Sequence, residues 1–172
     1  MNEAAQERKY YPPVKEDLGR LLQMFFGDRL SSLHLEITAT GRFSNGLKEK
    51  IGPGRDMIFS FLTRASPDIT GCVGVKESYG ESGFIIVEIK ARELKLDDIY
   101  QAHKYADLFD ARYGFLISAH SVPEELKRLS RTVYALLAFP GYGRMTLAKY
   151  SIEDREFGDW FPQNPFAAAR VA

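Results

Sequence analysis

Apolar residues recur along this chain with two spacings, which predict helices and strands. After the Pro12-Pro13 pair, apolar positions three and four residues apart are typical of an amphipathic helix. This spacing predicts a helix over 14–26 that ends at Gly27. The apolar stripe of that helix consists of Leu18, Leu21, Leu22, Phe25 and Phe26.

Strict alternation of apolar and polar residues predicts strands at 33–38 and 68–75. Residues 84–89 and 113–118 are almost continuously apolar, which is typical of strands buried on both faces. The other predicted elements are a short helix at 44–51, a strand at 57–62, helices at 96–109 and 123–129, and a last strand at 145–150.

This order of elements predicts an α/β fold, with a mixed central sheet and helices on its faces. A chain of 172 residues suits one domain. We therefore expect a single domain over 1–172, with a loose N-terminus at 1–12 and an appended tail at 159–172.

Composition excludes several classes of protein. Lys and Arg number 23, and so do Asp and Glu, so the chain is neither a wholly basic nucleic-acid wrapper nor a polyanion. The one cysteine, Cys72, cannot form an internal disulfide or a cysteine zinc cage. No apolar run approaches the roughly 18 residues that span a bilayer, and the N-terminal stretch lacks an apolar signal core. We expect a soluble, cytoplasmic protein with no membrane partner.

The candidate chemistry lies at Glu88-Ile89-Lys90, at the end of a strand predicted to be buried. An unpaired charge in such a strand costs several kcal/mol or more. Glu88 and Lys90 are two residues apart and therefore project from the same face. The preceding strand begins at Pro67-Asp68, and a turn at 78–83 can fold it back so that Asp68 lies beside Glu88.

Two carboxylates and one ammonium at adjacent strand positions suit a hard cation such as Mg²⁺, which takes oxygen ligands and keeps several waters. A bound ion of this kind polarises a phosphodiester and lowers the pKa of a bound water. Lys90 is then placed to orient that water or help to deprotonate it, and to offset developing negative charge.

Pro67-Asp68, followed 20 positions later by Glu88-Ile89-Lys90, resembles the motif of the PD-(D/E)XK nuclease superfamily. Gln101-Ala-His-Lys-Tyr105, on the helix that follows, resembles the Q-x-x-x-Y pattern of RecB-type and lambda-exonuclease-like members. Gln101 and Tyr105 are four residues apart and share one helix face.

The resemblance implies a restriction-endonuclease-like fold and a Mg²⁺- or Mn²⁺-dependent nuclease that cuts DNA. On the matching positions, Asp68 and Glu88 would hold the metal together with the carbonyl of Ile89. Lys90 would assist the attacking water, and Gln101 would support the site. Members commonly carry a further acid on the first core helix, for which Glu16 is the first candidate and Glu36 and Glu49 are rivals.

Other interpretations stay open. The same domain can be a catalytically silent module for nucleic-acid binding or assembly, or Glu88 and Lys90 can be an incidental surface pair at a strand end. Basic residues are concentrated in 42–64 and 127–149, where they can face phosphates or form a solvated surface. The choice between endo- and exonuclease is open, and a homodimer is compatible with the resemblance.

Overall fold

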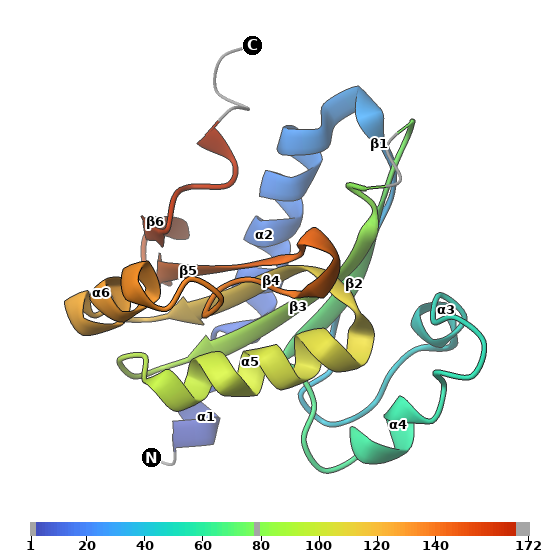
Figure 1. The fold of residues 1–172 in the computed structure, drawn as a ribbon, viewed down its shortest axis with the longest axis horizontal. Coiled ribbons are helices and arrows are strands. Elements are labelled where there is room, and N and C mark those ends of the chain that lie inside the picture. The colour runs from blue at the N-terminus through green and yellow to red at the C-terminus, as the bar shows by residue number, and fades with distance from the viewer. Residues whose placement is uncertain (1–2, 78–79, 168–172) are drawn as a thin grey trace.

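The computed structural model describes residues 3–77 and 80–167, and within them one sheet of six strands crosses the molecule (Figure 1). The strand order is β1-β2-β3-β4-β5-β6. The strands are β1 (Leu30–Ile37), β2 (Ile69–Val75), β3 (Gly83–Lys90), β4 (Ala111–Ser118), β5 (Arg144–Ser151) and β6 (Glu156–Phe161). β4 runs parallel to β3 and to β5, and the other neighbouring strands are antiparallel.

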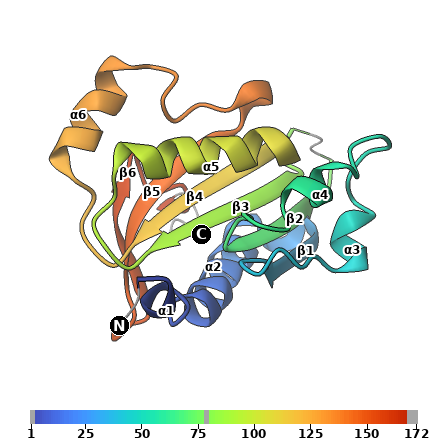
Figure 2. The ribbon, with the colours of Figure 1, turned by 90° about the horizontal axis from the view of Figure 1, so that it is seen from below.

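Helices cover both faces of this sheet (Figure 2). The long helix α2 (Tyr11–Phe26) lies on one face, and α5 (Leu96–Phe109) lies on the other. The remaining helical segments are α1 (Glu3–Glu7), α3 (Asn45–Lys48), α4 (Ile58–Phe61), α6 (Glu124–Thr132) and the 3₁₀ turns η1 (Gly27–Arg29) and η2 (Pro140–Tyr142). The predicted class, a mixed α/β sheet flanked by helices, is confirmed.

The first and last residues of α2, together with its apolar stripe, explain why this segment is helical. Prolines in the first turn cost no hydrogen bond, because those N–H positions have no partner within the helix. The helix ends at Gly27, whose positive φ of 51° suits glycine. Its buried apolar side chains, which pack on the sheet, are Tyr11, Val14, Leu18, Leu22 and Phe26.

Helix α5 connects β3 to β4 and covers the face that carries the candidate site. The N–H of Lys95 donates to the Asp98 carboxylate at 2.7 Å, which stabilises the first turn. At the other end Arg55 donates to the carbonyl of Leu108 at 2.7 Å, so an otherwise unpaired helix-end carbonyl gains a partner.

The strand predicted at 57–62 is wrong, because this segment contains α4. Ile58 and Leu62 are buried, whereas Met57 and Phe61 are exposed. The buried residues are four apart, which is the spacing of a helical turn and not of a strand. The other predicted helices and strands are present, with boundaries shifted by a few residues.

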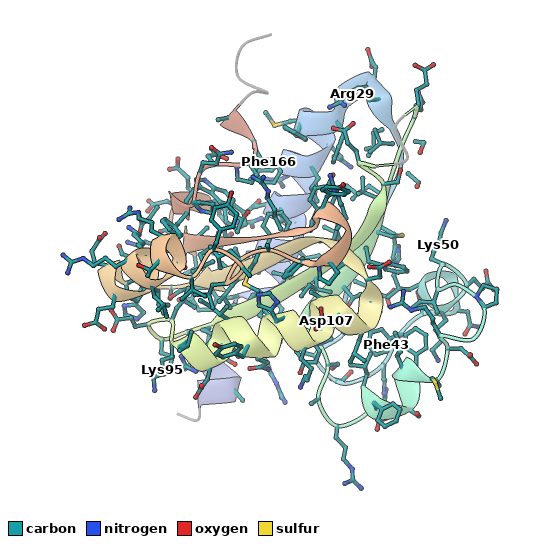
Figure 3. The ribbon with its side chains drawn as sticks, viewed as in Figure 1. Arg29, Phe43, Lys50, Lys95, Asp107 and Phe166 are labelled. Atoms are coloured by element: carbon teal, nitrogen blue, oxygen red, sulfur yellow. The ribbon has the colours of Figure 1, made fainter. Side chains whose placement is uncertain are left out.

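The prediction of loose ends is also wrong for the residues that the structure describes. α1 and the start of α2 lie within 1–12, and Glu7 and Tyr11 are buried. Strand β6 extends into 159–172 and pairs with β5. Phe166 is buried against Phe25 of α2 and Phe115 of β4, with ring centroids 5.8 and 6.1 Å apart (Figure 3). Residues 1–2 and 168–172 lie outside the described residues.

We expect Phe166→Ala to lower the free energy of unfolding by roughly 3 kcal/mol, because a large buried ring is replaced by a cavity. Tyr134→Ala is the matched control, since Tyr134 is exposed, and it should shift stability by less than about 0.5 kcal/mol. Urea denaturation of both variants measures the difference. Equal stability of the two would mean that residues 162–167 are indeed only appended to the domain.

Candidate active site

The pairing of β2 with β3 brings Asp68 next to Glu88. The register pairs Ile69 with Val87, and continuing it by one residue sets Asp68 opposite Glu88. The N–H of Ile89 donates to Asp68 Oδ2 at 2.7 Å, which ties the start of β2 to the end of β3. The predicted neighbourhood of the two carboxylates is thus present.

Glu88 and Lys90 project from β3 toward the α5 face of the sheet. Ile85, Val87 and Ile89 project toward the α2 face and pack in the core there, as the alternation predicts. Lys90 Nζ lies 3.4 Å from Glu88 Oε2. Glu88 Oε1 is buried and has no hydrogen-bond partner among the described residues.

All three charged residues are buried: Asp68 is 8%, Glu88 1% and Lys90 9% exposed. A surface pair of Glu88 and Lys90 is therefore excluded. A carboxylate oxygen that is buried and unpartnered is expensive, since it has lost water and gained no donor. Glu88 Oε1 is the one buried side-chain nitrogen or oxygen among the described residues that has no hydrogen-bond partner.

Burial raises the pKa of the Glu88 carboxyl well above its usual value, and the charge of Asp68 raises it further, against the opposing attraction of Lys90. Burial also raises the pKa of Asp68, although Tyr11, the Ile89 N–H and Lys90 oppose the shift. For Lys90, burial disfavours the charge, but the surrounding carboxylates, led by Glu88, outweigh it and raise its pKa.

Helix α5 brings Gln101 and Tyr105 to the same region. Tyr105 is buried, and the charges of Glu88 and Asp68 add to the burial that raises the pKa of its hydroxyl. Gln101 is half-buried, and its Nε2 donates to the Tyr105 Oη over a long 3.5 Å. Gln101 therefore contacts the site through Tyr105, and its supporting role stays a prediction.

Two residues near the site were not predicted as part of it, Glu7 of α1 and Tyr11 of α2. The Tyr11 hydroxyl is within hydrogen-bonding reach of the Asp68 carboxylate. Glu7 is buried, and its charge helps to raise the pKa of Lys90. The sequence contained a signal for Tyr11, because Tyr11 and Val14 continue the helical spacing of the apolar stripe backward from Leu18 by two turns.

The acids proposed for the first helix lie elsewhere. Glu16 is exposed and pairs with Arg155 and Arg20. Glu36 accepts hydrogen bonds from the N–H of Ser44 and from His34, and Glu49 is exposed. Of the acids on the first two helices, Glu7 is the one whose charge acts on Lys90.

Part of the basic surface is occupied by contacts within the chain. In the segment 42–64, Arg55 binds main-chain carbonyls at the end of α5. In the segment 127–149, Lys127 forms ion pairs with Glu124 and Asp159. Arg131 lies over the ring of Phe161. For these residues the contacts match a structural role, which leaves the remaining basic residues as candidates for phosphate contacts.

The donor set at the site fits Mg²⁺ or Mn²⁺ better than a softer ion. Asp68 and Glu88 supply carboxylate oxygens, and water would complete the shell. Among residues 3–77 and 80–167, no group of three or more His, Cys, Asp or Glu side chains is arranged to hold a metal ion.

Comparison of the chain with protein-family models, with curated proteins and with solved structures finds no match. The resemblance to PD-(D/E)XK nucleases therefore rests on the motif residues and their placement. None of the described helices combines the length and the apolar character that crossing a bilayer requires.

The raised pKa of Glu88 has a consequence for stability. Between the ordinary glutamate pKa of 4.5 and the raised value, the folded protein binds more protons than the unfolded chain. The free energy of unfolding of the metal-free protein should therefore fall as the pH rises through that window. Glu88→Gln lacks this titration, so its stability relative to the wild type should increase as the pH rises above 4.5.

Urea denaturation in the presence of a chelator, at pH values from about 4 to 8, measures this difference. Glu49→Gln is the matched control, because it changes an exposed carboxylate, and its difference from the wild type should not depend on the pH in this way. If the free energies of unfolding of Glu88→Gln and the wild type change with pH in parallel, the raised pKa of Glu88 is contradicted.

Proposed function

We propose that this protein is a metal-dependent nuclease that hydrolyses phosphodiester bonds in DNA. The observation that supports it best is the buried, unpartnered Oε1 of Glu88 beside Asp68 and Lys90. A buried oxygen without a hydrogen-bond partner lowers the stability of the folded protein. A divalent cation would give the oxygen a partner and offset two carboxylate charges.

Asp68, Glu88 and the carbonyl of Ile89 are the groups that would hold Mg²⁺ or Mn²⁺. When bound, such an ion polarises a phosphoryl oxygen and lowers the pKa of a coordinated water. The Ile89 N–H keeps the Asp68 carboxylate oriented through Oδ2, which leaves the other oxygen of that carboxylate for a further contact.

Lys90 supplies positive charge beside the two acids. In the metal-free protein the surrounding carboxylates raise its pKa, so the side chain is a cation at neutral pH and donates hydrogen bonds. That state suits orientation of the attacking water and compensation of the negative charge that develops on the phosphate. Gln101 would support the site from α5 through its contact with Tyr105.

The choice of DNA as substrate comes from the motif resemblance, and the residues of the site leave the form of the DNA open. Cleavage within a strand and removal of terminal nucleotides both use the same hydrolysis. The basic residues that have no partner inside the described part of the chain, Arg64 and Arg128 among them, would contribute sequence-independent phosphate contacts.

A second candidate function is favoured by the burial of the site. Asp68, Glu88 and Lys90 are each less than 10% exposed, so the site is covered in this conformation. A catalytically silent module for nucleic-acid binding or assembly would have no need to open it. Metal binding and turnover separate the two candidates.

We expect Asp68→Asn and Lys90→Met each to reduce Mg²⁺-dependent cleavage by at least about a hundredfold, because each removes a charge at the reacting centre. The measurement uses labelled linear, nicked, branched and single-stranded DNA, together with RNA. Lys76→Met is the matched control, because Lys76 is exposed beyond the opposite end of β2, and it should retain cleavage. Undiminished cleavage by both site variants would refute the assignment of the site.

We also expect Mg²⁺ or Mn²⁺ to raise the melting temperature of the wild type, since a ligand that binds only the folded state stabilises it by about 2.7 kcal/mol at a hundredfold excess over Kd. Glu88→Gln should lose most of this shift, and Glu49→Gln should keep it. The readout needs no substrate. A wild type that binds DNA and shows no metal-dependent shift would favour the silent module.

A further inference from the structure

A pocket of about 400 Å³ lies over β4 and β5, on the face of the sheet opposite to the one that carries the candidate active site. This volume is within the range of pockets that bind small molecules, about 300–1,000 Å³. The residues that give the pocket its chemistry are Arg112, Tyr113, Phe115, Tyr142, Arg144 and Thr146.

The parallel pairing of β4 with β5 builds the floor of this pocket. Tyr113 pairs with Arg144, and Phe115 pairs with Thr146. Tyr113 and Phe115 are two positions apart on β4, and Arg144 and Thr146 are two positions apart on β5. All four side chains therefore project from one face of the sheet. That face is the α2 face, because Phe115 and Tyr113 pack in the core on that side. Pro165, next to the buried Phe166, forms a wall.

Several hydrogen-bond donors in the pocket have no partner within the described part of the chain. Neither the Arg144 guanidinium nor the Thr146 hydroxyl has a hydrogen bond or ion pair with the described part of the chain. Arg112 uses one donor on the carbonyl of Gly141, at 3.2 Å, and a guanidinium has five. Among the described residues, no carboxylate lines the pocket. Glu81, whose charge acts on Tyr113, is paired with Arg29 at 2.7 Å.

Tyr142 stands at the edge of this pocket in an unfavourable backbone conformation. Its φ is 70°, a left-handed value that costs a residue with a side chain about 1 kcal/mol or more. Its side chain is 90% exposed, so no burial compensates the strain. An aromatic ring held at the mouth of a pocket that contains two arginines is suited to stack on a planar ligand that carries negative charge.

We propose that this pocket binds a nucleoside phosphate. The base lies against Phe115 and Pro165 with the Thr146 hydroxyl in reach, the phosphate lies between Arg112 and Arg144, and Tyr142 stacks at the mouth. A simple anion would use the arginines and leave the apolar floor unused. A purely apolar ligand would leave both guanidiniums unpaired. The shared chemistry is a base with a phosphate, either as a free nucleotide or as one unit of a strand.

This binding site is distinct from the candidate active site. Glu88 and Lys90 project toward the α5 face, whereas the pocket opens on the α2 face. Along β4, the five steps from Tyr113 to Ser118, which pairs with Lys90, span about 17 Å. Phe115 lies closer, because it pairs with Val87, but its side chain is on the opposite face from Glu88. The proposal uses no metal and does not depend on cleavage.

The test is isothermal titration calorimetry of the intact protein in a chelator, with adenosine monophosphate, a 5′-phosphorylated oligodeoxynucleotide and inorganic phosphate as separate ligands. We expect Arg144→Gln to weaken binding of the nucleotide ligands about tenfold or more, because a charge-assisted contact is lost. Tyr142→Ala should weaken it several-fold. Binding of the mononucleotide identifies a free nucleotide as the ligand, and binding of the oligonucleotide alone identifies a unit of a strand.

Two control variants match the substitutions. Arg8→Gln removes an exposed arginine from the turn between α1 and α2, and Tyr134→Ala removes a tyrosine that is 96% exposed. Both should leave binding within about twofold of the wild type. The proposal is overturned if neither nucleotide ligand binds at about 1 mM. It is also overturned if inorganic phosphate binds as tightly as the nucleotides, or if the controls weaken binding as much as the pocket variants do.

Asp68→Asn separates this proposal from the proposed function. The variant should bind the nucleotide ligands as the wild type does, since Asp68 does not line the pocket. Loss of cleavage with retained nucleotide binding by this variant supports both proposals. A wild type that cleaves DNA but binds neither nucleotide ligand overturns only this proposal, and retained cleavage by Asp68→Asn with retained nucleotide binding counts only against the proposed function.

Discussion

The Ile89 N–H donates a hydrogen bond to the Asp68 carboxylate at 2.7 Å. This bond connects the residue that precedes β2 to the end of β3. It depends on the register of the two strands, and a slip by one residue would turn every side chain of β3 to the other face. Glu88 and Lys90 would then lie in the α2-side core, and Ile85, Val87 and Ile89 would lie under α5. Because these isoleucines and Val87 are fully buried, the hydrophobic core and the charged site require the same register.

The apolar packing therefore compensates for the cost of the charged site. Two carboxylates and an ammonium that are buried together lose several kcal/mol of hydration each, and the 3.4 Å contact of Lys90 with Glu88 returns only part of it. One carboxylate oxygen has no partner within the described residues. A sequence that served stability alone would place apolar side chains at these positions, so the charges are best explained by a function that requires them.

Much of the fold and the center of the site were predictable, for a common physical reason. Burial on both faces makes β3 and β4 apolar, and a charge within such a strand is conspicuous, so Glu88 and Lys90 could be identified from their neighbours alone. The short segments were harder. Ile58 and Leu62 of α4 occupy a single turn, and one turn does not distinguish a helical from a strand period. Strand β6 was missed because acidic residues and a glycine interrupt its apolar positions, Phe157 and Phe161.

Glu7 shows a different limit of the sequence pattern. A carboxylate in a polar N-terminal stretch has no feature that marks it as buried, and its neighbours on α1 are exposed. It is buried because Tyr11 and Val14 attach the following helix to the sheet, which carries the preceding turn toward Lys90. Among residues 4–7, Glu7 is the one buried side chain, so the position of α1 depends on charge and not on apolar burial. Glu7 is thus a third carboxylate whose charge acts on Lys90, and a cation bound beside Lys90 would act on Glu7 as well.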